Sequence, residues 1–280
     1  MRTGLIGMPA PRTMWSVGSE QFHTLVLRGL EEAAIAAGHS VLTEVVDGPG
    51  AELAVVRAWA AERRVDVVVL KDLRRDDPRP AVLRTAGVPF VLAGDVRQSG
   101  ADAAVLHDNS GAMWKLLGDL LALGHRRIGH IEGPAGLLHS YWRREAYDAF
   151  VVEHRLPSLR VEGDYGAASG ARATGALLER DEPPTVLVFD NDAMAIGGIE
   201  RVRQLGLAVP RDISVVSWDD SLACQVSEPP LAVLGHRAHQ LGMDLGRAAS
   251  AVLAGAADGM RLVQELPVLT RRGSLAGVVP

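Results

Sequence analysis

Two short polar segments of this sequence have the residue types needed to hold a hydroxyl-rich molecule. Asp190–Asp192 and Asp219–Asp220 each follow directly on an apolar segment. The Asn191 side chain offers both a donor and an acceptor, which suits a hydroxyl. The Asp219 carboxylate can accept hydrogen bonds from two adjacent hydroxyls, the usual way to hold a diol. We therefore expect Asn191 and Asp219 to contact a small polar ligand, and Asp220 to be structural.

The elements around these residues are predicted by the spacing of apolar side chains. Thr185–Phe189 and Ile213–Trp218 are short apolar runs typical of buried strands. Between them, apolar residues recur with helical spacing from Ala193 until Gly206 ends the helix. We expect Asp192 to cap that helix. A strand, helix and strand with a short return indicate a parallel sheet, and ligands bind outside the carboxyl ends of such strands.

The same alternation runs along the rest of the chain. Strands are predicted at Thr3–Met8, Ser40–Val46, Val65–Leu70 and Val88–Ala93, with helices between them, and the pattern restarts at Arg127–Ile131. The sequence therefore predicts an α/β fold made of two similar doubly wound parallel-sheet lobes.

Composition narrows the class of protein. The chain has 280 residues, 48% of them hydrophobic, and a formal net charge of −5. The negative charge disfavours direct binding of this chain to a nucleic-acid backbone, which needs a clustered basic face. Cys224 is the single cysteine, so a disulfide within the chain is impossible and a reducing compartment is indicated. No apolar run approaches the ~18–20 residues that span a membrane, and the opening segment is too short for a secretory leader. We expect a cytoplasmic protein.

Motifs of the common enzyme classes are missing. The sequence has no G-x-x-x-x-G-K-[ST] phosphate loop, no H-E-x-x-H and no G-x-S-x-G. Its histidines and Cys224 show no paired spacing for a metal. We expect no cofactor, no metal and no catalytic activity; an enzyme working between the lobes stays a remote alternative that turnover of a ligand would reveal.

The stretch 191–220 carries a long ordered set of motif residues. They form an Asn-Asp pair, a helix with Met, Ala and Gly, a segment around Val-Pro-x-Asp-Ile-Ser-Val-Val, and a final aromatic-Asp-Asp. This order resembles the effector-binding core of the lactose-repressor (LacI/GalR) family of bacterial transcription regulators. Further matches lie at 27–34, 108–109, 123–128, 229–231 and 269–274. The matching residues of the main stretch are Asn191, Asp192, Met194, Ala195, Gly197, Gly206, Leu207, Val209, Pro210, Asp212, Ile213, Ser214, Val215, Val216, Trp218, Asp219 and Asp220.

The resemblance implies a periplasmic-binding-protein-like fold of type I, in which the chain crosses between the lobes three times. By analogy the crossings lie near His125, Leu234 and Asp258. The N-terminal lobe would then comprise 1–124 plus 236–258, and the C-terminal lobe 125–235 plus 259–280. The family binds its effector in the cleft between the lobes and works as a homodimer. It contacts operator DNA through a helix-turn-helix head, which does not match any part of this chain. Either the head was removed from this chain, which we favour, or the protein never had one.

The resemblance also implies particular ligand-binding side chains. Arg144 matches an arginine that holds ligand oxygens, and a guanidinium fork suits paired hydroxyls; the alternative is a solvated surface arginine. Tyr165 matches an aromatic that covers one face of a bound sugar or base, and otherwise would be a core tyrosine. His236 stands where the family has glutamine, in a segment whose usual threonines are replaced. The predicted ligand-binding residues are His23, Arg144, Tyr165, Asn191, Asp219 and His236, with Trp142 and His139 as weaker candidates.

These observations predict a ligand-sensing core of a DNA-binding regulator, a repressor by this resemblance. Two lobes would close on a sugar or nucleoside-like effector, and a homodimer would transmit the closure to the DNA-binding heads. The alternative is a solute-binding protein of a transport system with the same fold, which would require export.

Overall fold

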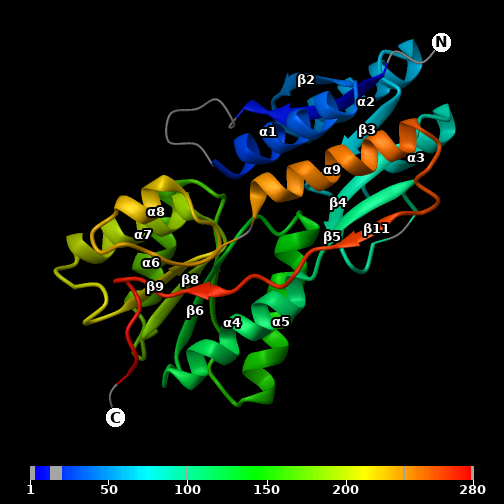
Figure 1. Ribbon diagram of the computed structural model, residues 1–280. Helices are drawn as coiled ribbons and strands as arrows, with labels where there is room; N and C mark the ends of the chain where they lie inside the picture. The colour runs from blue at the N-terminus through cyan, green and yellow to red at the C-terminus, as the bar shows by residue number, and fades with distance from the viewer. Residues whose placement is uncertain (1–3, 13–20, 99, 236, 279–280) are drawn as a thin grey trace. The chain divides into compact units, whose positions relative to one another are not determined.

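The computed structural model describes residues 4–12, 21–98, 100–235 and 237–278 and forms two compact α/β units (Figure 1). The first unit comprises Met1–Asp108 with Arg237–Glu265, and the second comprises Asn109–His236 with Leu266–Pro280. Each contains a sheet of six strands flanked by helices. The predicted fold class, an α/β chain with two parallel-sheet lobes, is confirmed.

The first unit has a parallel sheet with strand order β11-β5-β4-β3-β1-β2. Successive residues of a strand face opposite sides, so Ile6 and Met8 pack with α1 and α9 while Gly7 faces Trp59 of α2. The elements are β1 (Leu5–Pro11), α1 (Gln21–Ala36), β2 (Ser40–Val46), α2 (Gly48–Glu62), β3 (Val67–Leu70), α3 (Arg79–Ala86), β4 (Phe90–Asp95), β5 (Ala103–His107), α9 (Ala238–Leu253) and β11 (Arg261–Val263).

The second unit repeats this plan with strand order β12-β10-β9-β8-β6-β7, in which only β12 runs antiparallel to its neighbour among the described strands. Alternate residues of β8 separate two cores: Val186 and Val188 pack with α4 and α5, and Leu187 and Phe189 pack with α6 and α7. The elements are α4 (Asn109–Ala122), β6 (Ile128–Glu132), α5 (Leu138–Glu153), β7 (Leu159–Glu162), α6 (Ala167–Leu178), β8 (Val186–Phe189), α7 (Asp192–Gln204), β9 (Ser214–Ser217), α8 (Leu222–Val226), β10 (Ala232–Leu234) and β12 (Leu269–Thr270).

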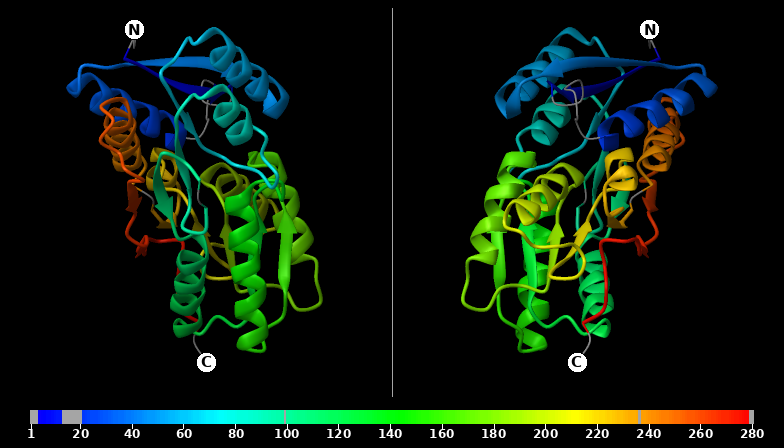
Figure 2. Two further views of the ribbon diagram at one scale, coloured as in Figure 1. Left: turned by 90° about the vertical axis from the view of Figure 1, so that its right-hand side faces the viewer. Right: turned by 90° about the vertical axis from the view of Figure 1, so that its left-hand side faces the viewer.

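The compact units divide the chain at other places than the predicted lobes. We expected α4 in the first lobe, but it packs beside α5 on the second sheet (Figure 2). We expected residues 259–265 in the second lobe, but β11 pairs with β5 in the first sheet. In both cases the tertiary partner decides to which unit the element belongs.

Each unit contains a helix pair in close backbone contact at glycines. A Cβ atom on Gly242 of α9 would lie well within 3.0 Å of the Val26 carbonyl oxygen of α1. A Cβ atom on Gly197 of α7 would similarly overlap the Ala167 carbonyl oxygen of α6. Glycine is therefore required at both crossings because any side chain would separate the helices.

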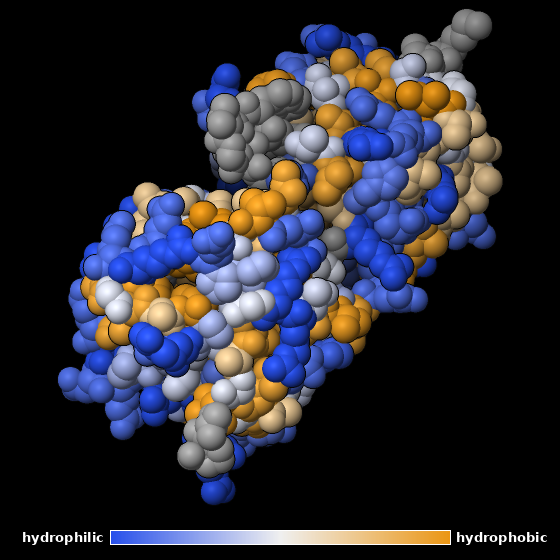
Figure 3. All heavy atoms as spheres, turned by 60° about the vertical axis from the view of Figure 1, so that its left-hand side comes forward, coloured by the Kyte–Doolittle hydropathy of each residue, from blue (hydrophilic) through white to orange (hydrophobic). Residues whose placement is uncertain are grey.

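On the molecular face drawn in Figure 3, hydrophobic and hydrophilic residues are intermixed. Large exposed apolar side chains come from separate elements, such as Ile35 of α1 and Val152 of α5. Across the described ranges, none of the helices combines the length and apolar character required to traverse a bilayer.

Candidate functional site

Asp190 lies at the centre of a buried polar network at the carboxyl end of β8. One carboxylate oxygen, Oδ1, accepts a hydrogen bond from His130 Nε2 at 3.0 Å, and Oδ2 accepts one from the Gly133 amide at 2.9 Å. Burial alone would raise the pKa of Asp190, but the electrostatic influence of the neighbouring His130 and Arg143 and these hydrogen bonds lower it to about 2. Asp190 is therefore ionised at neutral pH, and it ties β6, β8 and the loop before α5 together.

Arg143, on α5, is the cation that the Asp190 network holds. Its Nη1 atom donates to the Asp190 carbonyl oxygen at 3.3 Å and lies 3.7 Å from the Asp190 carboxylate. Its Nε atom donates to Asn109 Oδ1 at 3.2 Å. The guanidinium carbon lies 3.9 Å from the centre of the Trp218 ring, a cation–π contact. These contacts fix the arginine beside the ends of β8 and β9.

Arg144 points elsewhere, because adjacent helical residues are about 100° apart around the axis. It is half-buried, and its guanidinium carbon lies 5.4 Å from the Tyr141 ring centre. Trp142 is also half-buried, packs edge-on against Tyr141, and accepts a hydrogen bond from Ser110 Oγ through its carbonyl oxygen. The structure thus brings Arg143, rather than the predicted Arg144, into the strand-end network.

Tyr165 is held rigidly by its hydroxyl and by its backbone. The hydroxyl lies 2.8 Å from His139 Nε2 and 3.0 Å from Ser140 Oγ, and the Tyr165 and His139 rings are stacked. The Tyr165 carbonyl oxygen accepts a hydrogen bond from Asn191 Nδ2 at 3.0 Å. Tyr165 has a φ of +68°, a conformation that costs a non-glycine residue energy and recurs at ligand sites. Three predicted residues, His139, Tyr165 and Asn191, are therefore in direct contact.

Asn191 is the N-cap of α7, a role that we had predicted for Asp192. Its Oδ1 atom accepts a hydrogen bond from the Met194 amide at 3.0 Å, and its backbone is extended as a cap requires. Asp192 is the first helical residue instead and is buried. The prediction for Asp192 was wrong by one position.

Asp219 and Asp220 lie in a turn that follows β9. The Asp219 backbone accepts a hydrogen bond from Ser217 Oγ at 3.0 Å, and the Asp219 side chain is half-buried. Asp220 forms two hydrogen bonds with Arg272, at 2.8 and 2.7 Å, which agrees with the structural role expected of it. The turn is thereby anchored on both sides of Asp219.

In the first unit, His23 meets a lysine that the sequence patterns did not single out. His23 of α1 is half-buried, and its Nδ1 atom lies 3.1 Å from Lys71 Nζ. Lys71 follows directly on β3, is 6% exposed and also pairs with Asp72. A lysine immediately after an apolar strand was the signal that could have identified it. The remaining predicted residue, His236, lies outside the described residues.

A second charged cluster lies in the loop after β3. Arg79 is buried and binds Asp77, Glu52 and the Lys71 carbonyl oxygen. Burial raises the pKa of Glu52, although the charge of Arg79 opposes the shift. The cluster holds the 71–78 loop against α2. Among the residues that the structure describes, no group of three or more His, Cys, Asp or Glu side chains could hold a metal ion.

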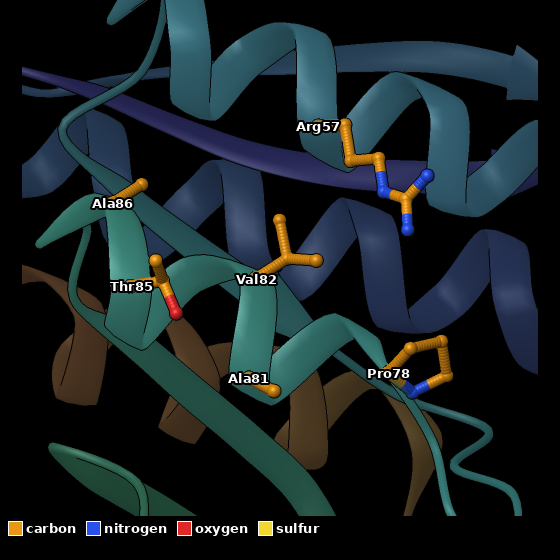
Figure 4. Close-up of a pocket in the computed structure, with 6 residues that line it drawn as sticks. All are labelled: Arg57, Pro78, Ala81, Val82, Thr85 and Ala86. Carbon is orange, nitrogen blue, oxygen red and sulfur yellow. The ribbon is translucent and has the colours of Figure 1, made fainter.

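A shallow groove of about 390 Å³ lies between α2 and α3 (Figure 4). It contains none of the predicted ligand residues and has few groups that could donate or accept hydrogen bonds. Its lining is Arg57, Pro78, Ala81, Val82, Thr85 and Ala86.

Comparison with known proteins agrees with this architecture. Residues 117–275, more than half of the chain, match the periplasmic binding protein-like domain family. The chain is 29% identical to the HTH-type transcriptional regulator CelR of Thermobifida fusca over 96% of this chain and 81% of that protein. The crystal structure of a LacI family transcriptional regulator from Bifidobacterium animalis is 26% identical, with a TM-score of 0.90 and full coverage of both chains.

The chain belongs to the LacI family of transcriptional regulators. A structure of a complex of the regulator CelR with cellobiose is likewise similar to this LacI-family chain. It is 27% identical, has a TM-score of 0.88, and the match covers 98% of this chain and 85% of that one. The similarity to transcriptional regulators favours the regulator over the transport protein as the function of this LacI-family chain.

Proposed function

We propose that this chain is the effector-binding core of a transcriptional repressor and that its effector is a sugar. The observation that carries the proposal is the preorganised polar network at the strand ends of the second unit, where Arg143, Tyr165 and Asp219 are each held by neighbouring groups. The complex of the similar regulator CelR with cellobiose supports a sugar. The core binds its effector and makes or breaks no bond.

The effector contacts the carboxyl ends of the strands of the second unit. In the second unit, the Tyr165 ring stacks on the apolar face of the sugar, Asp219 accepts from its hydroxyls and Arg143 donates to them. In the first unit, His23 and the neighbouring Lys71 are candidate ligand contacts. Asn191 and His139 hold Tyr165 in place from within the site. Trp142 is a further candidate at its border, and Arg144 and His236 are candidates by the family resemblance alone.

Effector binding is read out through a homodimer and DNA-binding heads. Binding of the sugar changes the geometry of the dimer, and this change alters the affinity of the heads for operator DNA. Couplings of this kind are typically about 1–3 kcal/mol, which corresponds to a change in DNA affinity of about 5- to 150-fold.

The test is a thermal-shift screen of this chain with cellobiose, other di- and monosaccharides, and nucleosides. A ligand at 100 times its Kd stabilises the folded state by about 2.7 kcal/mol. The hit is then titrated against Asp219→Ala, Arg143→Gln and the neighbouring control Arg144→Gln. We expect Arg143→Gln and Asp219→Ala to weaken binding at least about tenfold, and Arg144→Gln to change it by less than about threefold.

The outcomes separate the alternatives. A nucleoside hit without a sugar hit would refute the sugar assignment and keep the sensor. Loss of binding in Arg144→Gln but not in Arg143→Gln would move the site to the Tyr141 side of α5. No stabilisation by any sugar or nucleoside would overturn the proposal.

A further inference from the structure

We propose that Asp190 makes the site selective for an uncharged sugar, and that sugar phosphates and sugar acids are excluded. This inference rests on the proposed function and specifies the chemical class of its effector. It concerns a residue that lies behind the ligand-contacting side chains and acts through Arg143.

The charge of Arg143 is already compensated inside the protein. Arg143 is 8% exposed, and the Asp190 carboxylate lies 3.7 Å from its Nη1 atom. Asp190 is 2% exposed and therefore cannot turn away into solvent. A phosphate or carboxylate that approached Arg143 would lie close to a fixed, poorly screened negative charge. A hydroxyl would meet no such repulsion, because it brings no charge.

Two further carboxyl groups lie at the neighbouring strand ends. Asp192 is buried at the start of α7, and Asp219 follows β9. An ionised carboxylate only accepts hydrogen bonds, so it matches the hydroxyl groups of a sugar and repels an anion.

The charge of Asp190 can be removed with little change of side-chain shape. In Asp190→Asn the amide oxygen can still accept from Gly133, and the amide nitrogen can donate to His130 Nε2 in its other tautomer. Arg143 would keep its hydrogen bonds to Asn109 and to the carbonyl oxygen of residue 190. The variant therefore releases the positive charge of Arg143 without removing the arginine.

The experiment compares matched pairs of sugars that differ in charge. Calorimetric titration measures cellobiose against cellobionic acid, and glucose against glucose 6-phosphate, on the wild-type chain and on Asp190→Asn. The decisive quantity is the Kd of the anionic sugar divided by the Kd of the neutral sugar, taken for whichever pair binds more tightly. We expect this ratio to be at least about ten in the wild type, and to be about tenfold or more smaller in Asp190→Asn. The control is Glu132→Gln, which removes another buried carboxylate of the same sheet, paired with Arg160, and should leave the ratio unchanged.

Three results would overturn the inference. The first is a wild-type preference for the anionic sugar. The second is a folded Asp190→Asn variant in which the ratio of the two dissociation constants equals that of the wild type. The third is a Glu132→Gln variant in which this ratio changes as much as in Asp190→Asn. If Asp190→Asn does not fold, only the wild-type measurement is used. A wild type that binds the neutral sugar less than about tenfold more tightly than the anionic one then counts against the inference. Binding of no sugar of either kind would refute the proposed function first, and this inference with it.

Discussion

Replacing Gly197 with alanine should force apart two helices that carry parts of the candidate site. Gly197 lies on α7, and a Cβ atom there would overlap the carbonyl oxygen of Ala167 at the start of α6. Tyr165 lies two residues before the start of α6, and Asn191 caps α7. The hydrogen bond from Asn191 to the Tyr165 carbonyl oxygen spans the same junction. Separation of the helices should therefore both destabilise the second unit and displace Tyr165.

The magnitude follows from the kind of atom that the new methyl group meets. Overpacking costs about 1–3 kcal/mol, and the upper part of this range applies because a backbone carbonyl cannot rotate away as a side chain can. Alanine recovers up to about 1 kcal/mol through its higher helix propensity. The net loss should be about 1–2 kcal/mol, which lowers the Tm by about 2–8 °C for a unit of this size.

The matched control is Gly118→Ala in α4 of the same unit. Nothing lies within 4 Å of the position that its Cβ atom would occupy. The substitution should therefore stabilise by about 0.5–1 kcal/mol through propensity alone. Urea denaturation of both variants measures the two free energies, and titration with cellobiose measures the effect on the site. A Gly197→Ala variant as stable as the wild type, or two variants shifted in the same direction, would refute the packing argument.

Three further predictions concern buried polar groups of the second unit. Asn191→Ala should lose about 1–2 kcal/mol of stability, and Asn191→Ser should lose much less because serine also caps helices. The urea midpoints of the two variants measure the difference, and an equal loss of stability in both would contradict the capping role. Tyr147→Phe should lower the free energy of unfolding by about 2–4 kcal/mol. The reason is that the buried hydroxyl donates to the Ile128 carbonyl oxygen at 2.8 Å and accepts from the Leu159 amide at 2.9 Å. A variant that unfolds at the same urea concentration as the wild type would contradict this prediction. Folding lowers the pKa of Asp190 from 3.8 to about 2, so its contribution to the free energy of unfolding is complete above about pH 4 and is lost as the pH falls towards 2. Acid denaturation of Asp190→Asn should therefore show a smaller loss of stability over this pH range than the wild type. Identical pH profiles of the two proteins would argue against the lowered pKa.

The fold could be predicted because each strand and helix has its own periodic signal. The β8–α7–β9 stretch shows this most clearly, since its two apolar runs and its helical spacing each specify one element. The division into units was less accessible. The apolar face of α4 would fit either sheet, and only its packing on α5 and Trp218 assigns it to the second unit. A strand as short as β11 likewise carries no information on which edge it joins.

The site residues were harder to place because small shifts along the chain change what a side chain contacts. Arg143 and Arg144 are adjacent residues of the same type, and only the register of α5 decides which faces Asp190. Asn191 and Asp192 are both good caps, and the extended backbone at Asn191 decides between them. His130 within a buried strand was a signal that could have been used, because a buried imidazole needs a polar partner.

The hydrogen bonds behind the candidate site explain why its arginine and its aromatic ring can bind a ligand tightly. A ligand loses affinity when it must first order the side chains that hold it. His130 and Gly133 fix Asp190, and Asp190 in turn fixes Arg143. His139 and Asn191 fix Tyr165 in the same way. The arginine and the aromatic ring are thus ordered before any effector arrives, so that substitutions behind the site should weaken binding even though they remove no contact to the sugar.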